Sequence, residues 1–140
     1  TSGNGDTLIK PVLRWETSIA QVRSLAEGST IGYGRTYTTR KPTKTAVLPV
    51  GYADGYKYQL SNKASVLIGG KRCPVLGSVC MDQIVVDVTE VPDVAVGNTA
   101  TLIGVDGNER ITAEELAQLA GTIPYDILTG IGARVRREYH

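Results

Sequence analysis

A glycine pair set between two apolar, β-branched runs constrains this fold more than any other feature of the sequence. Residues 64–68 and 71–76 flank Gly69-Gly70, and a two-glycine loop between such runs favours a tight β-hairpin. Further strands are expected at residues 45–52, 83–88 and 99–104, separated by turn signals at Val91-Pro92-Asp93 and Gly97-Asn98. We therefore expect sheet to dominate the middle of the chain.

Two short helices are predicted late in the chain. Thr112 and Glu115 form a capping box, in which the threonine hydroxyl accepts from a helix amide and the glutamate reaches back. The first helix then runs up to Gly121, which suits a left-handed stop. Pro124 can open the second helix, to about Thr129, because its ring presets the backbone angle.

The ends of the chain are less regular. Residues 1–10 are expected to be a flexible end or a cut linker, because their first part is small, polar and glycine-rich. Residues 8–25 fit helix and strand patterns about equally, and we favour strand because the sequence that follows is strongly β. Residues 134–139 return to strand-like alternation. The predicted fold is a mainly β, small barrel-like domain over residues 11–140, with seven or more strands and two short helices near the C-terminus.

Composition excludes several function classes. The 140 residues suit one domain, and a net charge of +1 from 15 basic and 14 acidic residues predicts no nucleic-acid partner. No run is long and apolar enough for a membrane span. Cys73 and Cys80 lack zinc or redox spacing, so free thiols in a reducing compartment are expected. The single histidine is His140, which leaves no nucleophile pair and no metal site in view.

Tyrosine is over-represented, with seven tyrosines, one tryptophan and no phenylalanine. Five of the tyrosines fall between Tyr33 and Tyr58. Four of these five lie in the first two of four short runs whose order and spacing are more specific together than apart: Gly32-Tyr33-Gly34-Arg35-Thr36-Tyr37, Gly51-Tyr52-Ala53-Asp54-Gly55-Tyr56, Gly77-Ser78-Val79-Cys80-Met81-Asp82-Gln83 and Ile123-Pro124-Tyr125-Asp126.

These four runs, over residues 11–139, resemble the C-terminal domain of the alanine racemases. In that family an N-terminal (β/α)₈ barrel binds pyridoxal 5'-phosphate on a lysine, and a mostly β domain follows. The resemblance implies that this chain is the second part alone, since none of its lysines lies in a context like the cofactor motif. It further implies a pyridoxal-phosphate-dependent isomerase that interconverts L- and D-alanine for peptidoglycan precursors. The chain by itself is expected to be inactive, because racemisation needs the cofactor as an electron sink.

The resemblance assigns Tyr33 as the catalytic residue. In the family this tyrosine is one of two opposed bases, the other being the cofactor lysine, and it reaches the site of the second subunit of a homodimer. Two groups on opposite faces suit inversion, because a proton leaves one face of the α-carbon and returns on the other. Without the surrounding motif, a strand tyrosine anchored by its hydroxyl would be the simpler interpretation.

Four further residues receive roles from the resemblance. The backbone amide of Met81 is expected to bind the substrate carboxylate, and Tyr52 and Asp82 are expected to line the access corridor. Tyr125 is expected to hydrogen-bond the cofactor phosphate and narrow the site around the substrate methyl group. The simpler alternatives are a core methionine, a strand aromatic, a turn carboxylate and packing at a helix start.

Two departures from the family pattern leave the substrate open. Ser78 and Tyr58 stand where many relatives carry arginine, which alters the charge of the corridor. Serine-directed relatives share this domain, so serine stays open as the substrate. Membrane-tethered relatives share it too, and we therefore expect the parent either free in the cytoplasm or as the cytoplasmic domain of a tethered protein. The alternative from another function class is a non-catalytic β-domain whose tyrosines bind a ligand or a partner protein.

Overall fold

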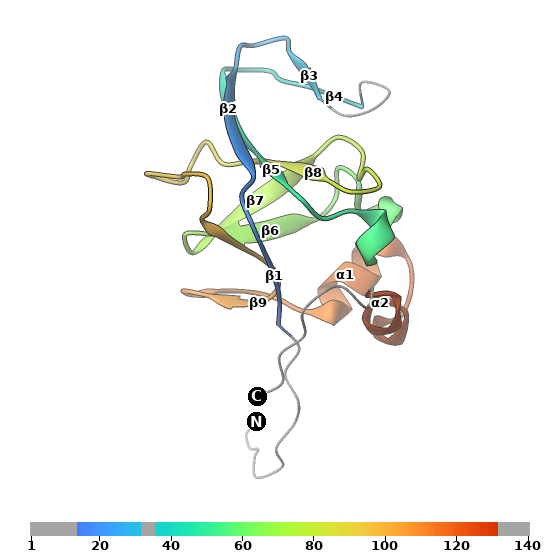
Figure 1. Cartoon of the computed structure of the whole chain (residues 1–140). Helices are drawn as coiled ribbons and strands as arrows, with labels where there is room; N and C mark the ends of the chain where they lie inside the picture. The colour runs from blue at the N-terminus through green and yellow to red at the C-terminus, as the bar shows by residue number, and fades with distance from the viewer. Residues whose placement is uncertain (1–13, 32–35, 132–140) are drawn as a thin grey trace.

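The computed structural model describes residues 14–31 and 36–131, and these form one curled sheet, a small arm and two helices (Figure 1). Within these residues, no helix is long and apolar enough to cross a membrane. The strands are β1 (Trp15–Ser18), β2 (Gln21–Leu25), β3 (Thr30–Ile31), β4 (Tyr37–Thr38), β5 (Thr43–Leu48), β6 (Ser65–Ile68), β7 (Lys71–Leu76), β8 (Ile84–Asp87), β9 (Thr99–Asp106) and β10 (Glu109–Ile111). Helical turns are η1 (Tyr52–Asp54) and η2 (Tyr58–Leu60), followed by α1 (Ala113–Ala120) and α2 (Pro124–Gly130).

The main sheet is antiparallel and bends back toward its own start. Its strand order is β1-β9-β6-β7-β8-β5-β2, with β10 paired to β9. The two end strands are consecutive in the chain, joined by Ile19 and Ala20. The Ile19 N–H donates to the carbonyl of Asn98, just before β9, and the Ala20 N–H donates to the carbonyl of Val47 in β5, each at 2.9 Å. The link therefore bonds to the strands next to both end strands of the sheet. The predicted mainly β domain is confirmed, as a curled sheet in which no ladder between described residues joins β1 to β2.

The predicted glycine hairpin is confirmed. Ile68 pairs with Lys71, and Gly69 and Gly70 have φ angles of 61° and 77°, the positive values that a tight two-residue turn requires. The Gly70 N–H also donates to the Asp106 carboxylate at 3.0 Å. This bond ties the β6–β7 turn to the end of β9.

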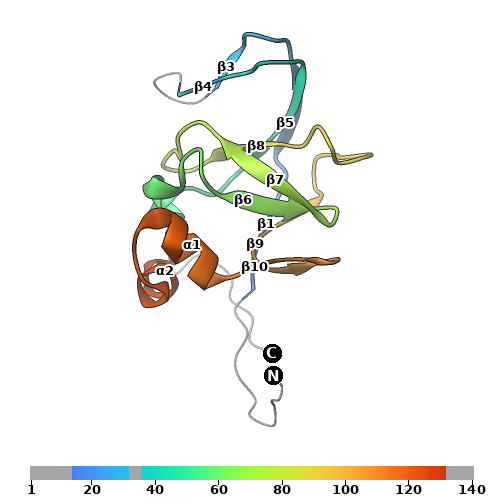
Figure 2. The ribbon, with the colours of Figure 1, turned by 180° about the vertical axis from the view of Figure 1, so that it is seen from behind.

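The core fills the inside of the curled sheet and the layer under the helices. β6 is buried on both faces, because Val66 and Leu67, which point to opposite faces of the sheet, are both 0% exposed. Trp15 and Tyr56 pack edge to face with their ring centroids 6.0 Å apart. Figure 2 shows α1 and α2 gathered at one end of the sheet, beside the helical turns that follow β5.

The late helices form as predicted, but half of the capping box does not. The Glu115 N–H donates to the Thr112 hydroxyl at 3.1 Å, while the Glu115 carboxylate accepts from Arg72 at 2.7 and 2.9 Å instead of reaching back. A guanidinium offers two parallel donors to a carboxylate, which one backbone amide cannot match. Gly121 ends α1 with φ 75°, and Pro124 opens α2.

The strand predicted at residues 45–52 is shorter than expected. β5 ends at Leu48, and η1 begins at Tyr52, where the backbone donors go to a neighbouring loop instead of a strand. The strand expected at residues 8–25 is confirmed from Trp15 onward, as β1 and β2, and its residues 8–13 lie outside the described residues. The flexible end expected at residues 1–10 and the strand expected at residues 134–139 lie outside the described residues.

A two-stranded arm stands apart from the main sheet, at the top of Figure 1. β3 and β4 pair antiparallel, with Ile31 opposite Tyr37. At the base of the arm the buried Thr39 hydroxyl accepts from the Ser29 N–H at 2.9 Å and donates to the Ala26 carbonyl at 2.8 Å. The sequence run that contains Tyr33 follows β3 in the chain and ends at Tyr37, the first residue of β4.

Candidate active site

The run that begins at Gly51 is locked against the loop that contains Met81. The Tyr52 N–H donates to the Cys80 carbonyl at 3.0 Å, and the Ala53 N–H donates to the Met81 carbonyl at 2.9 Å. A Cβ on Gly51 would collide with the Cys80 carbonyl and would lie 2.6 Å from the Met81 carbonyl oxygen. Only glycine therefore permits this approach of the two segments.

Met81 is an exposed residue of this loop. Its side chain is 56% exposed, so Met81 is not a core methionine. Its carbonyl is occupied by Ala53, but its N–H has no acceptor among the described residues. Asp82, the next residue, is exposed too. Among the described residues the N–H groups of Asp82 and Gln83 have no acceptor either, so the loop offers several unpaired amide donors beside the Asp82 carboxylate.

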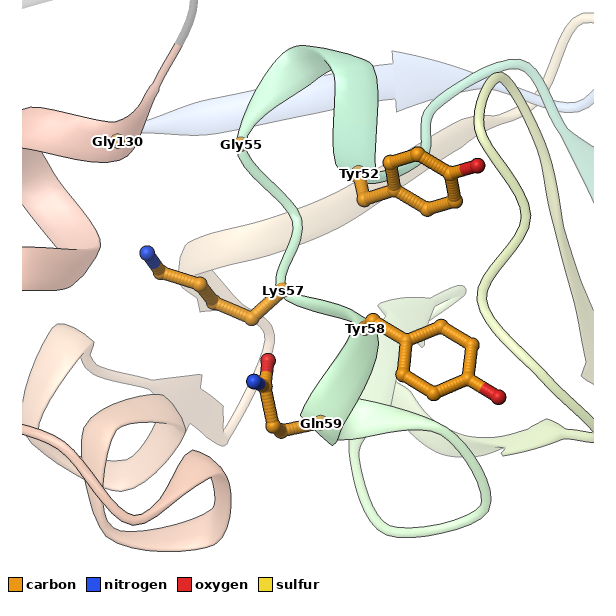
Figure 3. Close-up of a pocket in the computed structure, with 6 residues that line it drawn as sticks. All are labelled: Tyr52, Gly55, Lys57, Tyr58, Gln59 and Gly130. Carbon is orange, nitrogen blue, oxygen red and sulfur yellow. The ribbon is translucent and has the colours of Figure 1, made fainter.

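An open pocket of about 540 Å³ lies where η1, η2 and the end of α2 meet. Its lining consists of Tyr52, Gly55, Lys57, Tyr58, Gln59 and Gly130. In Figure 3 the Tyr52 and Tyr58 rings point to the same side, while the Lys57 side chain extends toward Gly130 at the end of α2. Gly55 has φ 100°, and a Cβ there would collide with the Gly130 carbonyl, so η1 meets α2 closely.

The start of α2 is tied to this pocket by an ion pair. The Lys57 ammonium lies 3.0 Å from the Asp126 carboxylate, which also accepts from the Thr122 hydroxyl at 3.0 Å. These bonds, chiefly the one from Lys57, hold the pKa of Asp126 below its ordinary value. Tyr125, the preceding residue, is 72% exposed, so its ring is not part of the helix packing.

Tyr33 itself lies outside the described residues, but the flanks of its run are fixed. Thr36 contacts the Met81 loop through its hydroxyl, which lies 3.1 Å from the Ser78 hydroxyl. The Asn62 amide donates to the Thr36 carbonyl at 3.3 Å. Contacts between described residues therefore join all four sequence runs: the first to the third at Ser78, the second to the third at Gly51, and the second to the fourth near Lys57.

Sequence reasoning missed two residues of this arrangement. Lys57 gave no signal, because its partner lies 69 positions away in the fourth run. Asn62 had a weak one, since asparagine tolerates the left-handed conformation that it adopts here with φ 58°. Ser78 and Tyr58, noted as departures from a family pattern, both lie in the site region, Ser78 against Thr36 and Tyr58 in the pocket wall.

Residues 12–139 match the family model described as alanine racemase, C-terminal domain. The chain belongs to this family. Curated relatives include alanine racemases from Halothermothrix orenii, 51% identical over 94% of the chain, and Symbiobacterium thermophilum, 53% identical over 94%. In both cases the chain spans only 35% of the relative's length.

Solved alanine racemases share the fold of this C-terminal domain. The enzyme from E. faecalis aligns with a TM-score of 0.84 and 39% identity, over 91% of this chain and 33% of that one. The enzyme from Bartonella henselae, with covalently bound pyridoxal phosphate, aligns with a TM-score of 0.79 and 35% identity, over 85% of this chain and 32% of that one. The racemase domain described here thus corresponds to about a third of each.

Proposed function

We propose that this chain is the C-terminal domain of a pyridoxal-phosphate-dependent alanine racemase, which interconverts L- and D-alanine by two-base proton transfer. The observation that carries the proposal is that the Met81 loop contacts the Tyr52 run through its carbonyls and contacts Thr36, in the Tyr33 run, through the Ser78 hydroxyl. Its support from outside the chain is the family match and the alanine racemases among its relatives.

Substrate binding in this proposal begins at the Met81 loop. An amide donor without a protein acceptor is suited to a substrate carboxylate, because a charge-assisted hydrogen bond is stronger than one to water. Tyr52 and Asp82 lie next to this donor and would line the access corridor, where a phenol and a carboxylate select a small zwitterion. The side chain of Met81 is not required for the contact.

The residues present fit a peripheral contact with the cofactor. The exposed Tyr125 ring can give its hydroxyl to the phosphate group of pyridoxal phosphate held by a neighbouring domain. Lys57, which lines the pocket, is already paired with Asp126, so we assign the cofactor lysine to the N-terminal barrel domain. When bound, the cofactor supplies the electron sink for the negative charge at the substrate α-carbon.

Tyr33 is assigned to the proton transfer on one face of the α-carbon, in the site of the second subunit. A phenol with an ordinary pKa near 10 is a weak base at neutral pH, so a neighbouring cation has to favour the phenolate. Since Lys57 is engaged by Asp126, we expect that cation to come from the barrel. The partners are thus the barrel domain, a second subunit and a small amino acid.

Two consequences of the proposal concern the chain alone and its location. Without the barrel the chain is expected to be inactive. The free cysteines Cys73 and Cys80 are consistent with the reducing cytoplasm, where we place the reaction, either in a free enzyme or in the cytoplasmic domain of a tethered one. There it would supply D-alanine for peptidoglycan precursors.

A chimera tests the proposal. Residues 12–139 replace the corresponding domain of the E. faecalis alanine racemase, and turnover of alanine and serine is measured for the chimera and for its Tyr33→Phe variant. We expect alanine racemisation that Tyr33→Phe lowers at least about a hundredfold, in line with the loss of a general base. A dimeric chimera that binds the cofactor but racemises neither amino acid would contradict the proposal and favour a non-catalytic domain. Faster turnover of serine would assign a serine racemase.

As a second route, the unfused chain is mixed with the separate barrel domain carrying the cofactor. Racemisation should appear on mixing and be absent with the Tyr33→Phe chain. If the two parts form a stable complex that stays inactive, the proposal fails independently of the chimera.

A further inference from the structure

Asn62 joins three segments of the site through its backbone and its side chain. Its Oδ1 accepts from the Gly77 N–H at 2.7 Å, and its own N–H donates to the Gly77 carbonyl at 3.2 Å. Its Nδ2 donates to the carbonyl of Thr36 at 3.3 Å. One side chain therefore bridges the end of η2, the loop that leads to Met81 and the C-terminal flank of the Tyr33 run.

The loop from Gly77 to Met81 is also held by Ser61, which follows η2. The Val79 N–H donates to the Ser61 hydroxyl at 2.7 Å, and that hydroxyl donates to the Tyr58 carbonyl at 2.6 Å. Ser78, between Gly77 and Val79, is buried and lies 3.1 Å from the Thr36 hydroxyl. Thr36 is thus attached to this loop directly at Ser78 and indirectly through Asn62, which is itself bonded to Gly77.

The arm that carries the Tyr33 run needs such an attachment. β3 and β4 contribute two residues each, and an isolated two-stranded ribbon is marginally stable in water. Thr39 fixes the arm at its base, while Thr36 is the described residue nearest in sequence to Tyr33 on the C-terminal side. The Asn62 bridge therefore acts at the far end of the arm.

We propose that Asn62 is a positioning residue that holds the flank of the Tyr33 run at a fixed distance from the Met81 amide. This inference deepens the proposed function and rests on it. Through Asn62, the Tyr33 run is bonded to the same loop that carries the Met81 amide, the proposed donor for the substrate carboxylate. Asparagine suits the position because it accepts and donates at once and tolerates φ 58°.

Two variants separate the contacts. Asn62→Asp keeps the acceptor for Gly77 and removes the donor to Thr36, while Asn62→Gly keeps the positive φ and removes both side-chain bonds. Asn98→Asp is the matched control, because the Asn98 side chain only accepts, from the Ala95 N–H at 2.9 Å, in a turn away from the arm. It makes the same change of charge without touching Thr36.

Hydrogen exchange on the 140-residue chain tests whether Asn62 orders the β3–β4 arm. Asn62→Asp should speed amide exchange at Ile31 and Tyr37 by about two- to tenfold, the loss of one hydrogen bond, and leave β6 and β7 unchanged. Asn62→Gly should do so at least as strongly, and Asn98→Asp should not. Unchanged exchange at Ile31 and Tyr37 in both Asn62 variants overturns the inference.

A double-mutant cycle in the chimera tests whether Asn62 affects turnover through Tyr33. Asn62→Asp should lower kcat about tenfold with little change in KM, and should cause no further loss in a Tyr33→Phe background. If Tyr33→Phe lowers kcat but Asn62→Asp either has no effect or adds to it in full, the positioning role is wrong while the proposed function stands. If Tyr33→Phe itself has no effect, the proposed function fails.

Discussion

The β6–β7 hairpin and the β3–β4 arm are both antiparallel ribbons, but they are held in different ways. β6 is buried on both faces, and Arg72 on β7 forms ion pairs with Glu109 and Glu115. The arm stands apart from the core and is fixed mainly by hydroxyl and amide contacts at Thr39 and Thr36. The first ribbon stabilises the domain, and the second positions a short run of residues. Substitutions in the two should therefore separate global stability from local order.

The largest effect is expected from Leu67→Ala in β6. Leu67 is fully buried in a strand with neighbours on both sides, so the change removes apolar contacts and leaves a cavity. We expect a loss of about 3 kcal/mol in the free energy of unfolding, measured by urea denaturation. Val105→Ala, at an exposed position of β9, is the control and should change it by less than about 0.5 kcal/mol. Similar losses at both sites would break the comparison.

Thr39→Val should act on the arm more than on the domain. The change keeps the shape of the side chain but removes the bonds with Ser29 and Ala26, which contribute about 1 kcal/mol each at most to local order. Amide exchange at Ile31 and Tyr37 should rise about tenfold, with a smaller change in the urea midpoint. An equal loss in global unfolding would mean that the arm and the core unfold together.

Tyr56→Phe should be close to neutral, although Tyr56 is one of the most buried residues of the core. Its hydroxyl is buried without a hydrogen-bond partner among residues 14–31 and 36–131, and burial raises its pKa. Removing an unsatisfied hydroxyl should change the free energy of unfolding by between zero and about 1 kcal/mol in the stabilising direction. Clear destabilisation by urea denaturation would show that the hydroxyl is satisfied in solution.

The smallest effect is expected at the Lys57–Asp126 pair. The pKa of Asp126 lies below its ordinary value of 3.8 in the folded state, so the pair stabilises the fold above that pH and this contribution disappears as pH falls through the lowered value. Asp126→Asn should lower the urea midpoint slightly near neutral pH and match the parent chain in strong acid. A difference that persists in acid would point to packing instead of charge.

Local signals predicted the elements well, and contacts distant in sequence decided the rest. Gly69-Gly70, Thr112 and Pro124 each act within a few residues, and the turns and helix ends they predict are present. The turn at Tyr52 could not be predicted, because it depends on carbonyls almost thirty positions away. Glu115 likewise finds Arg72, 43 positions away, instead of its own helix start.

The candidate site divides in the same way. The family resemblance proposed roles for Met81, Asp82, Tyr52 and Tyr125, and the structure brings Tyr52 and the Met81 loop into contact. Asn62 and Lys57 were missed because their roles come from partners in other runs. Ser78 was noted only as a lost cation, whereas its hydroxyl contacts Thr36. Residue identity supplied the candidates for substrate contact, and the fold was needed to find the residues that hold them in place.

The central claim is that this chain supplies one of two bases that act on opposite faces of the α-carbon. The most direct measurement follows exchange of the α-proton of L- and D-alanine with deuterated solvent in the chimera, with and without Tyr33→Phe. We predict that Tyr33→Phe abolishes exchange for one enantiomer and leaves it for the other, because the opposite base is untouched. Equal loss, or equal retention, for both enantiomers would contradict the account.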